Sequence, residues 1–433
     1  MVAENTHTAL IKIWNETVGA VLWNRLGGFA TFEYDPGFPN KGLDLSPRMM
    51  PLHEAQAGNT IFEFRTLSRE TFMGLPGLLA DSLPDKFGNR IIDAWLARQG
   101  RSAEDFSPVE RLCYTGIRGM GALEFEPTID SGVEDSVPVE VGELVELAAR
   151  ILHERSNLQL SLDTSDSVLD IFRVGTSAGG ARAKAVIALN DATREIRSGQ
   201  VKAPEGFDYW ILKFDGVKDE SLGDPEGYGL IEYAYYNMAL AAGIKMTECR
   251  IYEEGGRSHF MTRRFDRTRG GGKLHFQSLC GIAHFDYNAA GQYAYEQAFQ
   301  VMRQLRLPYQ DTEQLFRRMV LNILARNQDD HTKNIAFIMD KEGTWRLSPA
   351  FDVIYAHNPG GQWTNLHQMS VNGKRTDFNK DDVLVVADEA GVKKPEDIIR
   401  QVAESVARWP KFAREAGVSK MQTENIGNHH RRL

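Results

Sequence analysis

The sequence predicts an α+β protein with a β-rich N-terminal part and a mostly helical C-terminal part. Short runs of β-branched and aromatic residues, such as 10–14 and 28–34, recur early in the chain between turn residues. Beyond about residue 275, apolar residues instead repeat at helical spacing, as in 315–324. Between these parts, residues 126–138 are acidic and rich in Pro, Ser and Gly, which predicts a boundary.

Composition excludes several classes of function. The chain has 433 residues, and 50 Lys and Arg against 59 Asp and Glu give a net charge of −9. With 42% hydrophobic residues it has the composition of a globular protein rather than a disordered one. An acidic chain is not drawn onto DNA or an anionic membrane by its overall charge, although a local basic patch remains possible.

The order of elements predicts three regions. Residues 1–130 form a β-rich N-terminal subdomain with a helical insertion, residues 139–270 a small antiparallel sheet, and residues 271–433 a mostly helical domain. The expected strands of the middle region are 185–189, 209–214, 248–252 and 259–265, with one helix at 230–242. Asp311 and Gln314 predict a capping-box helix start.

The cysteines and the N-terminus predict a cytoplasmic protein without a structural metal. Cys113, Cys249 and Cys280 are far apart and have no metal-ligand spacing. The first residues lack the basic and apolar regions of a signal peptide, and no apolar run is long enough to span a membrane.

A glycine-rich segment, residues 173–184, is the first candidate binding site. Gly175, Gly179 and Gly180 would let backbone N–H groups approach phosphate oxygens, and Lys184 would add positive charge. The spacing is not that of a Walker A loop, and an ordinary turn has the same composition.

Lys213 is the second candidate, because it lies in the apolar run Trp210–Phe214. Its amine either reaches solvent or is held inward by an anion. A helix containing Glu232 follows, which is similar to the pairing of a strand lysine with a helix glutamate in protein kinases.

The segment Asn327–Asn334 is the most specific feature. Asp329 and Asn334 have the spacing of a kinase catalytic loop, in which the Asp accepts the substrate hydroxyl proton and the Asn binds metal. A solvated loop is the alternative. However, residues 335–347 read as a hairpin, which would return the chain so that Asp352 lies beside Asn334 and shares Mg²⁺ with it.

Together these motifs resemble the HipA family of bacterial toxin–antitoxin serine/threonine kinases over nearly the whole chain. The matching N-terminal segments are 45–52, 75–84 and 116–123, and the later ones are 177–184, 263–267, 329–334 and 348–352. The resemblance implies a kinase-like, two-lobed fold that uses ATP and Mg²⁺.

The resemblance also implies a role for each matching residue. Asp329 would be the catalytic base, and Asn334 and Asp352 would hold Mg²⁺. The implied ATP-binding residues are Gly179, Gly180, Ala181, Arg182, Ala183, Lys184, Lys213, Arg263, Arg264, Phe265, His331, Lys333, Asn334 and Asp352. The segment Arg263–Phe265 would contact adenine mainly through its backbone.

Family members phosphorylate a serine of glutamyl-tRNA synthetase and a serine of their own phosphate loop, which here corresponds to Ser177. A phosphate at that position would repel ATP. The implied partner is a HipB-like helix-turn-helix antitoxin dimer, through which operator DNA would mainly be met. Two alternatives stay open: a catalytically weak corepressor that binds the antitoxin, and a small-molecule kinase.

Overall fold

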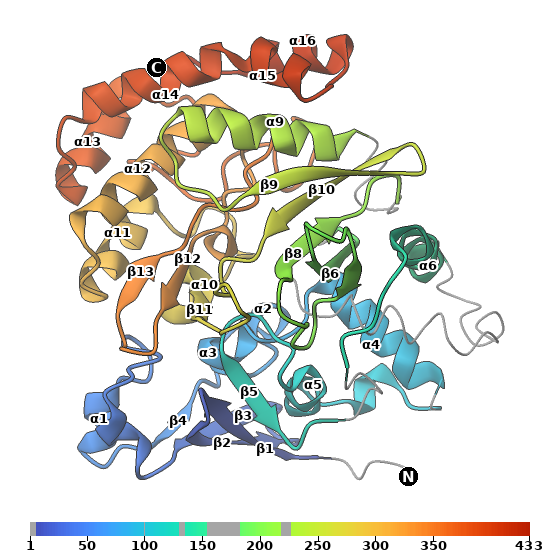
Figure 1. Cartoon of the computed structure of the whole chain (residues 1–433). Helices are drawn as coiled ribbons and strands as arrows, with labels where there is room; N and C mark the ends of the chain where they lie inside the picture. The colour runs from blue at the N-terminus through green and yellow to red at the C-terminus, as the bar shows by residue number, and fades with distance from the viewer. Residues whose placement is uncertain (1–5, 99, 130–134, 154–181, 218–226) are drawn as a thin grey trace. The chain divides into compact units, whose positions relative to one another are not determined.

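The computed structural model describes residues 6–98, 100–129, 135–153, 182–217 and 227–433. The chain divides into two compact units (Figure 1). The first unit comprises residues 1–226, 252–276 and 340–343, and the second comprises 227–251, 277–339 and 344–433. The predicted α+β class is confirmed, since sheets dominate the first unit and helices the second.

The first unit begins with a five-stranded sheet in the order β4-β3-β2-β1-β5. Its strands are β1 (Thr8–Ile13), β2 (Glu16–Asn24), β3 (Phe29–Tyr34), β4 (Ile61–Glu63) and β5 (Leu123–Glu126). The strands β1 and β2 pair antiparallel as a hairpin through a tight turn at Trp14 and Asn15. One face of the sheet is buried by alternating residues such as Ala9, Ile11 and Ile13.

Short helices connect β3 to β5 in this unit. They are α1 (Leu52–Gln56), α2 (Arg69–Phe72), α3 (Gly77–Ala80), α4 (Lys86–Arg98) and α5 (Pro108–Thr115), with 3₁₀ turns at Phe38–Lys41 and Ala103–Asp105. The helix α5 starts with a capping box, in which Ser107 accepts from the Glu110 N–H and Glu110 accepts from the Ser107 N–H.

The second sheet has the order β7-β6-β8-β10-β9. Its strands are β6 (Lys184–Leu189), β7 (Ile196–Ser198), β8 (Asp208–Lys213), β9 (Cys249–Glu254) and β10 (Arg257–Arg263). The antiparallel pairing expected from the sequence is present between β6 and β8 and between β8 and β10. The short strand β7 was not predicted, because three residues carry too little periodicity.

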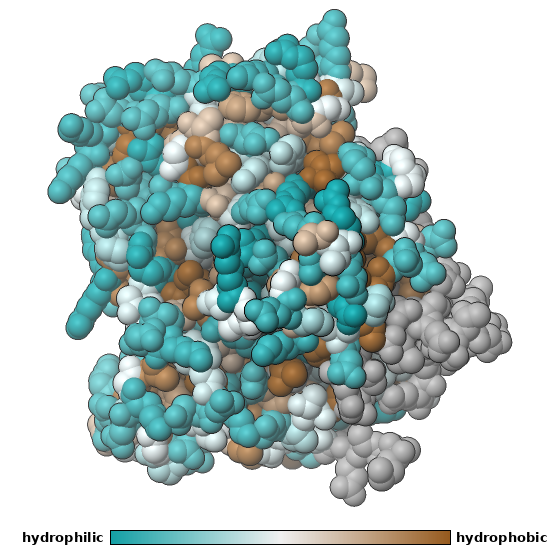
Figure 2. Space-filling view, viewed as in Figure 1, coloured by the Kyte–Doolittle hydropathy of each residue, from teal (hydrophilic) through white to brown (hydrophobic). Residues whose placement is uncertain are grey.

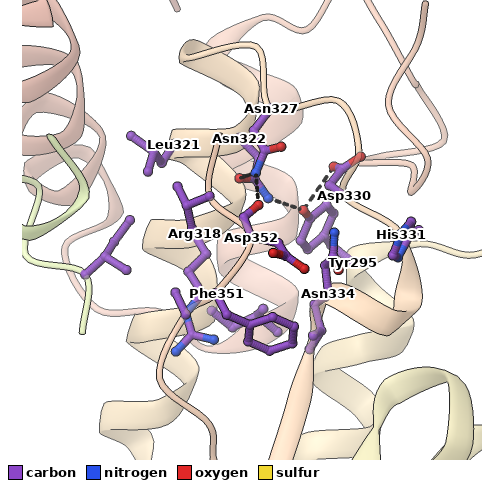
Figure 3. Close-up of a pocket in the computed structure, with 15 residues that line it drawn as sticks. Tyr295, Arg318, Leu321, Asn322, Asn327, Asp330, His331, Asn334, Phe351 and Asp352 are labelled. Carbon is purple, nitrogen blue, oxygen red and sulfur yellow. Dashed lines mark hydrogen bonds between the residues drawn. The ribbon is translucent and has the colours of Figure 1, made fainter. Parts of the chain in front are cut away.

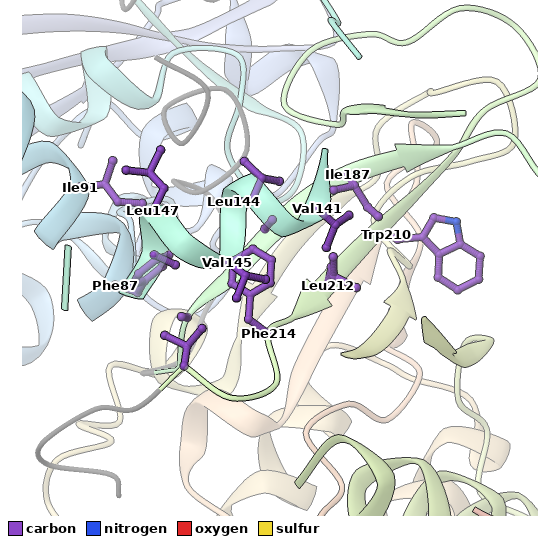
Figure 4. Packing of buried hydrophobic residues seen from close by; sticks show 14 of the residues in the cluster. Phe87, Ile91, Val141, Leu144, Val145, Leu147, Ile187, Trp210, Leu212 and Phe214 are labelled. Carbon is purple, nitrogen blue, oxygen red and sulfur yellow. The ribbon is translucent and has the colours of Figure 1, made fainter. Parts of the chain in front are cut away.

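Helices α4 and α6 (Val141–His153) share a hydrophobic core with this second sheet. Phe87 and Ile91 of α4 belong to the same buried cluster as Leu144 of α6 and as Trp210 and Leu212 of β8 (Figure 4). Since α4 belongs to the N-terminal part of the sequence, this core joins the N-terminal subdomain to the second sheet.

The second unit is mostly helical. Its helices are α9 (Tyr228–Ala241), α10 (Leu279–Ala283), α11 (Tyr295–Gln304), α12 (Tyr309–Leu324), α13 (Lys380–Ala390), α14 (Pro395–Ala407), α15 (Trp409–Glu415) and α16 (Lys420–His429). In Figure 1, α9 runs beside α14 and α15, and it packs against both. Figure 2 shows that the outer surface of α14–α16 is mostly hydrophilic, as expected for helices with one buried face.

The strand β12 (Ala336–Met339) pairs antiparallel with β13 (Trp345–Leu347), which confirms the hairpin predicted after the catalytic-loop motif. Together with β11 (His275–Ser278) they form a sheet in the order β11-β12-β13.

The predicted capping-box start of α12 is wrong. The helix begins at Tyr309 after Pro308, without a side-chain cap. Asp311 is instead buried in the first turn and accepts two hydrogen bonds from Arg346, at 2.8 and 2.9 Å. Gln314 accepts from the Lys245 N–H. Asp311 and Gln314 therefore form hydrogen bonds with residues distant in sequence, and neither side chain caps the helix.

Within the described part of the chain, no helix is both long and apolar enough to cross a membrane. Cys113, Cys249 and Cys280 are all buried, and none of the three forms a disulfide bond.

Candidate active site

The register of the second sheet brings two candidate phosphate ligands together. Lys184 begins β6, Lys213 ends β8, and the two are directly paired across the antiparallel ladder. Residues paired in this way project from the same face of a sheet, with Cβ atoms about 5 Å apart. Like charges at such positions repel each other, so an anion bound near this pair would be stabilised by both ammonium groups.

Lys184 already has one carboxylate partner. Its Nζ lies 2.9 Å from Oδ2 of Asp85, and the exposed fractions of the two side chains are only 3% and 8%. Lys213 lies near the aromatic ring of Phe260, with Nζ 5.6 Å from the ring centroid. Asp85 is 99 positions from Lys184 in the sequence. No sequence motif predicted this ion pair.

The segment Arg263–Phe265 follows β10. Arg263 donates to Asp208 at 2.5 Å, and the Arg264 N–H donates to the carbonyl of Tyr209 at 2.9 Å. The Arg264 side chain is buried and binds Asp266 through Nε and Nη2, at 2.9 and 2.7 Å. Both the backbone N–H and the side chain of Arg264 therefore form hydrogen bonds within the protein.

Asp266 is the centre of a buried charged cluster. Burial alone would raise the pKa of its carboxyl, but Arg264 and Arg267 hold that pKa far below its usual range. Burial, together with the charge of Arg264, lowers the pKa of Arg267 to about 10. The Gly121 N–H also donates to Asp266, at 2.8 Å.

This cluster explains the sequence segment 116–123. The carbonyl of Gly119 accepts from Arg264 and Arg267, and the carbonyl of Gly121 accepts from Arg267. Gly121 has φ of +77°, and a Cβ there would lie 3.0 Å from the backbone nitrogen of Phe276. Gly121 is needed because the backbone of the N-terminal subdomain approaches the backbone at Phe276 closely here.

The catalytic-loop motif lies in the second unit, after helix α12. Arg326 has a left-handed φ of +57°, which ends the helix and turns the chain into the loop. The 3₁₀ turn Thr332–Asn334 closes the loop. There the Asn334 side chain donates from Nδ2 to the carbonyl of Asp329 at 2.7 Å, so its amide oxygen points away from that carbonyl.

The neighbours Asp329 and Asp330 have opposite environments. The side chain of Asp329 is 48% exposed, with one carboxylate oxygen 3.8 Å from Nε2 of His331. Asp330 is buried and accepts from the Tyr295 hydroxyl at 3.0 Å, from the Gln368 N–H at 2.8 Å and from His367 Nδ1 at 2.8 Å. Burial alone would raise the pKa of Asp330, but His367 and these donors lower it.

Asn334 and Asp352 line the same pocket (Figure 3). Asp352 follows the hairpin and has a left-handed φ of +51°, which is unusual for a residue other than glycine. Its carbonyl accepts from Asn327 Nδ2 at 3.4 Å, and the same Nδ2 donates to Asn322 on α12. Strained backbone that is held by neighbouring contacts is frequent at functional sites.

His331 and Lys333 both lie against Tyr287. The ring centroids of His331 and Tyr287 are 5.4 Å apart, and Lys333 Nζ is 4.5 Å from the Tyr287 centroid. Nothing in the sequence pointed to Tyr287, because a single aromatic residue in a loop carries no periodic information.

The donors at this pocket suit Mg²⁺. This cation prefers oxygen ligands, and it often takes one or two from the protein and the rest from water and phosphate. Asn334 offers an amide oxygen and Asp352 a carboxylate. Among the described residues, no group of three or more His, Cys, Asp or Glu side chains is placed so that it could hold a metal ion.

Comparison with known families agrees with the resemblance found in the sequence. The HipA-like C-terminal domain matches residues 176–409, which is more than half of the chain, and the HipA N-terminal domain matches residues 9–126. The chain belongs to the HipA family. Asp85, Lys184, Lys213, Asp329, Asn334 and Asp352 all fall within these two matched ranges of the HipA family.

A solved structure has the same fold. It is described as the Shewanella oneidensis MR-1 toxin antitoxin system HipA, HipB and its operator DNA complex. The TM-score is 0.68 at 15% identity, and the alignment covers 97% of this chain and 94% of that one. The Helicobacter pylori proinflammatory kinase CtkA gives a TM-score of only 0.36 at 12% identity, over 58% of this chain and 87% of that one. No curated protein matches the sequence significantly.

Several predicted positions stay predictions. Ser177, Gly179, Gly180 and Ala181 lie outside the described residues, whereas Arg182 and Ala183 lie just before β6. Lys213 and Glu232 belong to different compact units, so their expected pairing is not tested.

Proposed function

We propose that this HipA family member is an ATP-dependent serine/threonine protein kinase and the toxin of a toxin–antitoxin module. The observation that carries this proposal is the pocket that Asn334 and Asp352 share, directly beside the loop that presents Asp329. The spacing from Asp329 to Asn334 is that of a kinase catalytic loop.

In this proposal Asp329 accepts the proton of the substrate hydroxyl. Its half-exposed carboxylate is accessible to a hydroxyl group, whereas the buried Asp330 fixes the loop. Asn334 and Asp352 would hold Mg²⁺, which when bound neutralises phosphate charge during transfer. His331 and Lys333 would lie near the phosphates from the same loop.

The resemblance assigns the other nucleotide contacts to residues earlier in the chain. Lys184 and Lys213 would bind phosphate oxygens, together with the glycine-rich segment 179–183. Adenine would meet the backbone of Arg263–Phe265. Since the Arg264 N–H already donates to Tyr209 and its side chain to Asp266, the adenine contact is assigned to the remaining backbone groups of this segment.

The resemblance supplies the partners of the proposal: a HipB-like antitoxin dimer, operator DNA reached mainly through it, and a serine of a translation protein such as glutamyl-tRNA synthetase. Autophosphorylation is assigned to Ser177. The related structure with HipB and operator DNA supports the antitoxin assignment by fold similarity.

The test is phosphosite mapping after incubation of the full chain with MgATP, alone and with bacterial lysate. We expect a phosphoserine at residue 177 and a phosphorylated protein in the lysate, and neither with Asp329→Gln. Phosphorylation of metabolites alone would indicate a small-molecule kinase. Antitoxin binding without any transfer would indicate a corepressor.

A further inference from the structure

The ion pair between Lys184 and Asp85 links the proposed phosphate site to the N-terminal subdomain. Lys184 begins β6 of the second sheet, and Asp85 directly precedes helix α4 (Lys86–Arg98). The two side chains meet at 2.9 Å and are almost fully buried. Two charges removed from water in this way cost desolvation energy, so a buried pair by itself is weak evidence for a role in stability.

The carboxylate of Asp85 is held in place by the start of α4. Its Oδ1 accepts from the Gly88 N–H at 2.6 Å, which leaves Oδ2 for Lys184. The Asp85 carbonyl accepts from the Asn89 N–H at 2.8 Å, so the residue begins the helix. One carboxylate therefore both caps the helix and orients the ammonium group.

The helix itself is fixed on both sides. Phe87 and Ile91 of α4 are buried in the core shared with the second sheet (Figure 4). From α5, Arg111 donates to Asn89 at 2.7 Å and to Asp93 at 3.0 Å. Asp85 thus approaches Lys184 from a rigid element rather than from a loop.

The cross-strand register gives this pair a consequence for ligand binding. Lys184 faces Lys213 directly, so the two ammonium groups repel each other. A carboxylate that holds Lys184 reduces this repulsion and fixes the position of its Nζ. A lysine held in this way is preorganised for a phosphate, which lowers the cost of binding it.

We propose that Asp85 is the positioning residue for Lys184, so that the N-terminal subdomain sets the affinity of the site for the phosphates of a nucleoside triphosphate. This inference rests on the proposed kinase function. In protein kinases a helix glutamate forms an ion pair with the strand lysine that binds phosphate. Here Asp85, which lies outside the second sheet, would have this role toward Lys184.

The test compares Asp85→Asn with wild type in the full chain. Asparagine still caps a helix, so α4 is retained while the charge is lost. We expect the Kd for MgATP, measured by titration without turnover, to rise about tenfold, as for one lost charge-assisted contact. The KM for ATP should rise in parallel while kcat changes less, and Asp85→Glu should restore part of the affinity.

Asp93→Asn is the matched control, because it makes the same change on the same helix and alters only the contact with Arg111. It should leave the Kd for MgATP unchanged. Unchanged or tighter MgATP binding by folded Asp85→Asn would overturn the inference. If wild type itself binds no MgATP, the proposed function fails instead, so the two failures are distinguishable.

Discussion

Two buried aspartates hold functional segments by different means. In the first unit, Asp266 is surrounded by the cations Arg264 and Arg267. In the second unit, Asp330 is held by a tyrosine hydroxyl, a backbone N–H and one histidine. A change from Asp to Asn keeps the shape and removes the charge. The loss of unfolding free energy caused by an Asp-to-Asn change should therefore depend on the charge of the aspartate's partners as well as on its burial.

Asp266→Asn should have the largest effect. It leaves two buried guanidinium groups without a carboxylate, which costs about 3 to 5 kcal/mol of unfolding free energy. Denaturant unfolding measures this loss. The control is Asp208→Asn, whose pair with Arg263 is more exposed, with side-chain exposures of 35% and 21%. That variant should lose less than about 1 kcal/mol. Equal losses in the two variants would contradict the role of burial.

Asp330→Asn should cost less, about 1 to 3 kcal/mol. The asparagine oxygen can still accept from Tyr295 or Gln368, and the lost contact is mainly that with His367. The same denaturant experiment measures it. A loss as large as that of Asp266→Asn would contradict the expected difference between the two aspartates.

Gly121→Ala tests the backbone side of the Asp266 cluster. The left-handed φ of +77° disfavours alanine, and the new Cβ would meet Phe276 at 3.0 Å. We expect a loss of about 1 to 2 kcal/mol. Gly42→Ala is the control, because Gly42 has a similar φ of +74° but no atom within 4 Å of the added Cβ. If both variants lose the same free energy, the close approach contributes nothing.

Acidification should affect the C-terminal segment before either aspartate. His430 contacts the Tyr235 hydroxyl at 3.1 Å, and burial lowers its pKa to about 4. Because the unfolded chain binds a proton at this residue below about pH 6.5, stability falls as the pH decreases from 6.5 toward 4. By pH 5.5 the loss is about 1 kcal/mol.

The loss appears as faster hydrogen exchange at 426–431. His430→Gln should reduce this pH dependence, and the remainder comes from His357, which packs against His429 and whose pKa burial also lowers to about 4. The pKa values of Asp266 and Asp330 are both lowered, so their contributions are lost only below the unfolded pKa of about 3.8. Residues 119–121 report on the Asp266 cluster. If, on acidification, hydrogen exchange became faster at 119–121 before it did at 426–431, the expected order would be wrong.

The sequence predicted the parts of the site that depend on local pattern. The hairpin after Asn334 is one such feature, and it carries the chain back so that Asp352 enters the pocket of Asn334. Alternating and helical periodicities also predicted β6, β8 and α12, although not the start of α12.

The contacts that complete the site depend on distant residues. The register of the second sheet places Lys184 opposite Lys213. The carboxylate that binds Lys184 comes from Asp85, 99 positions earlier, at the start of α4. The sequence also gives no means of telling Asp329 from Asp330 by burial, because both stand in one polar run. Only the packing of Tyr295 and His367 separates them.

The most direct test of the account is the rate of γ-phosphate transfer by Asp329→Asn with MgATP, measured in a single turnover. The account expects a loss of about 10³-fold or more, with the melting temperature and the Kd for MgATP close to those of wild type. Removal of Mg²⁺ with EDTA should abolish transfer by wild type. Transfer by Asp329→Asn at the wild-type rate would contradict the assignment of the catalytic base and, with it, the proposed function of this loop.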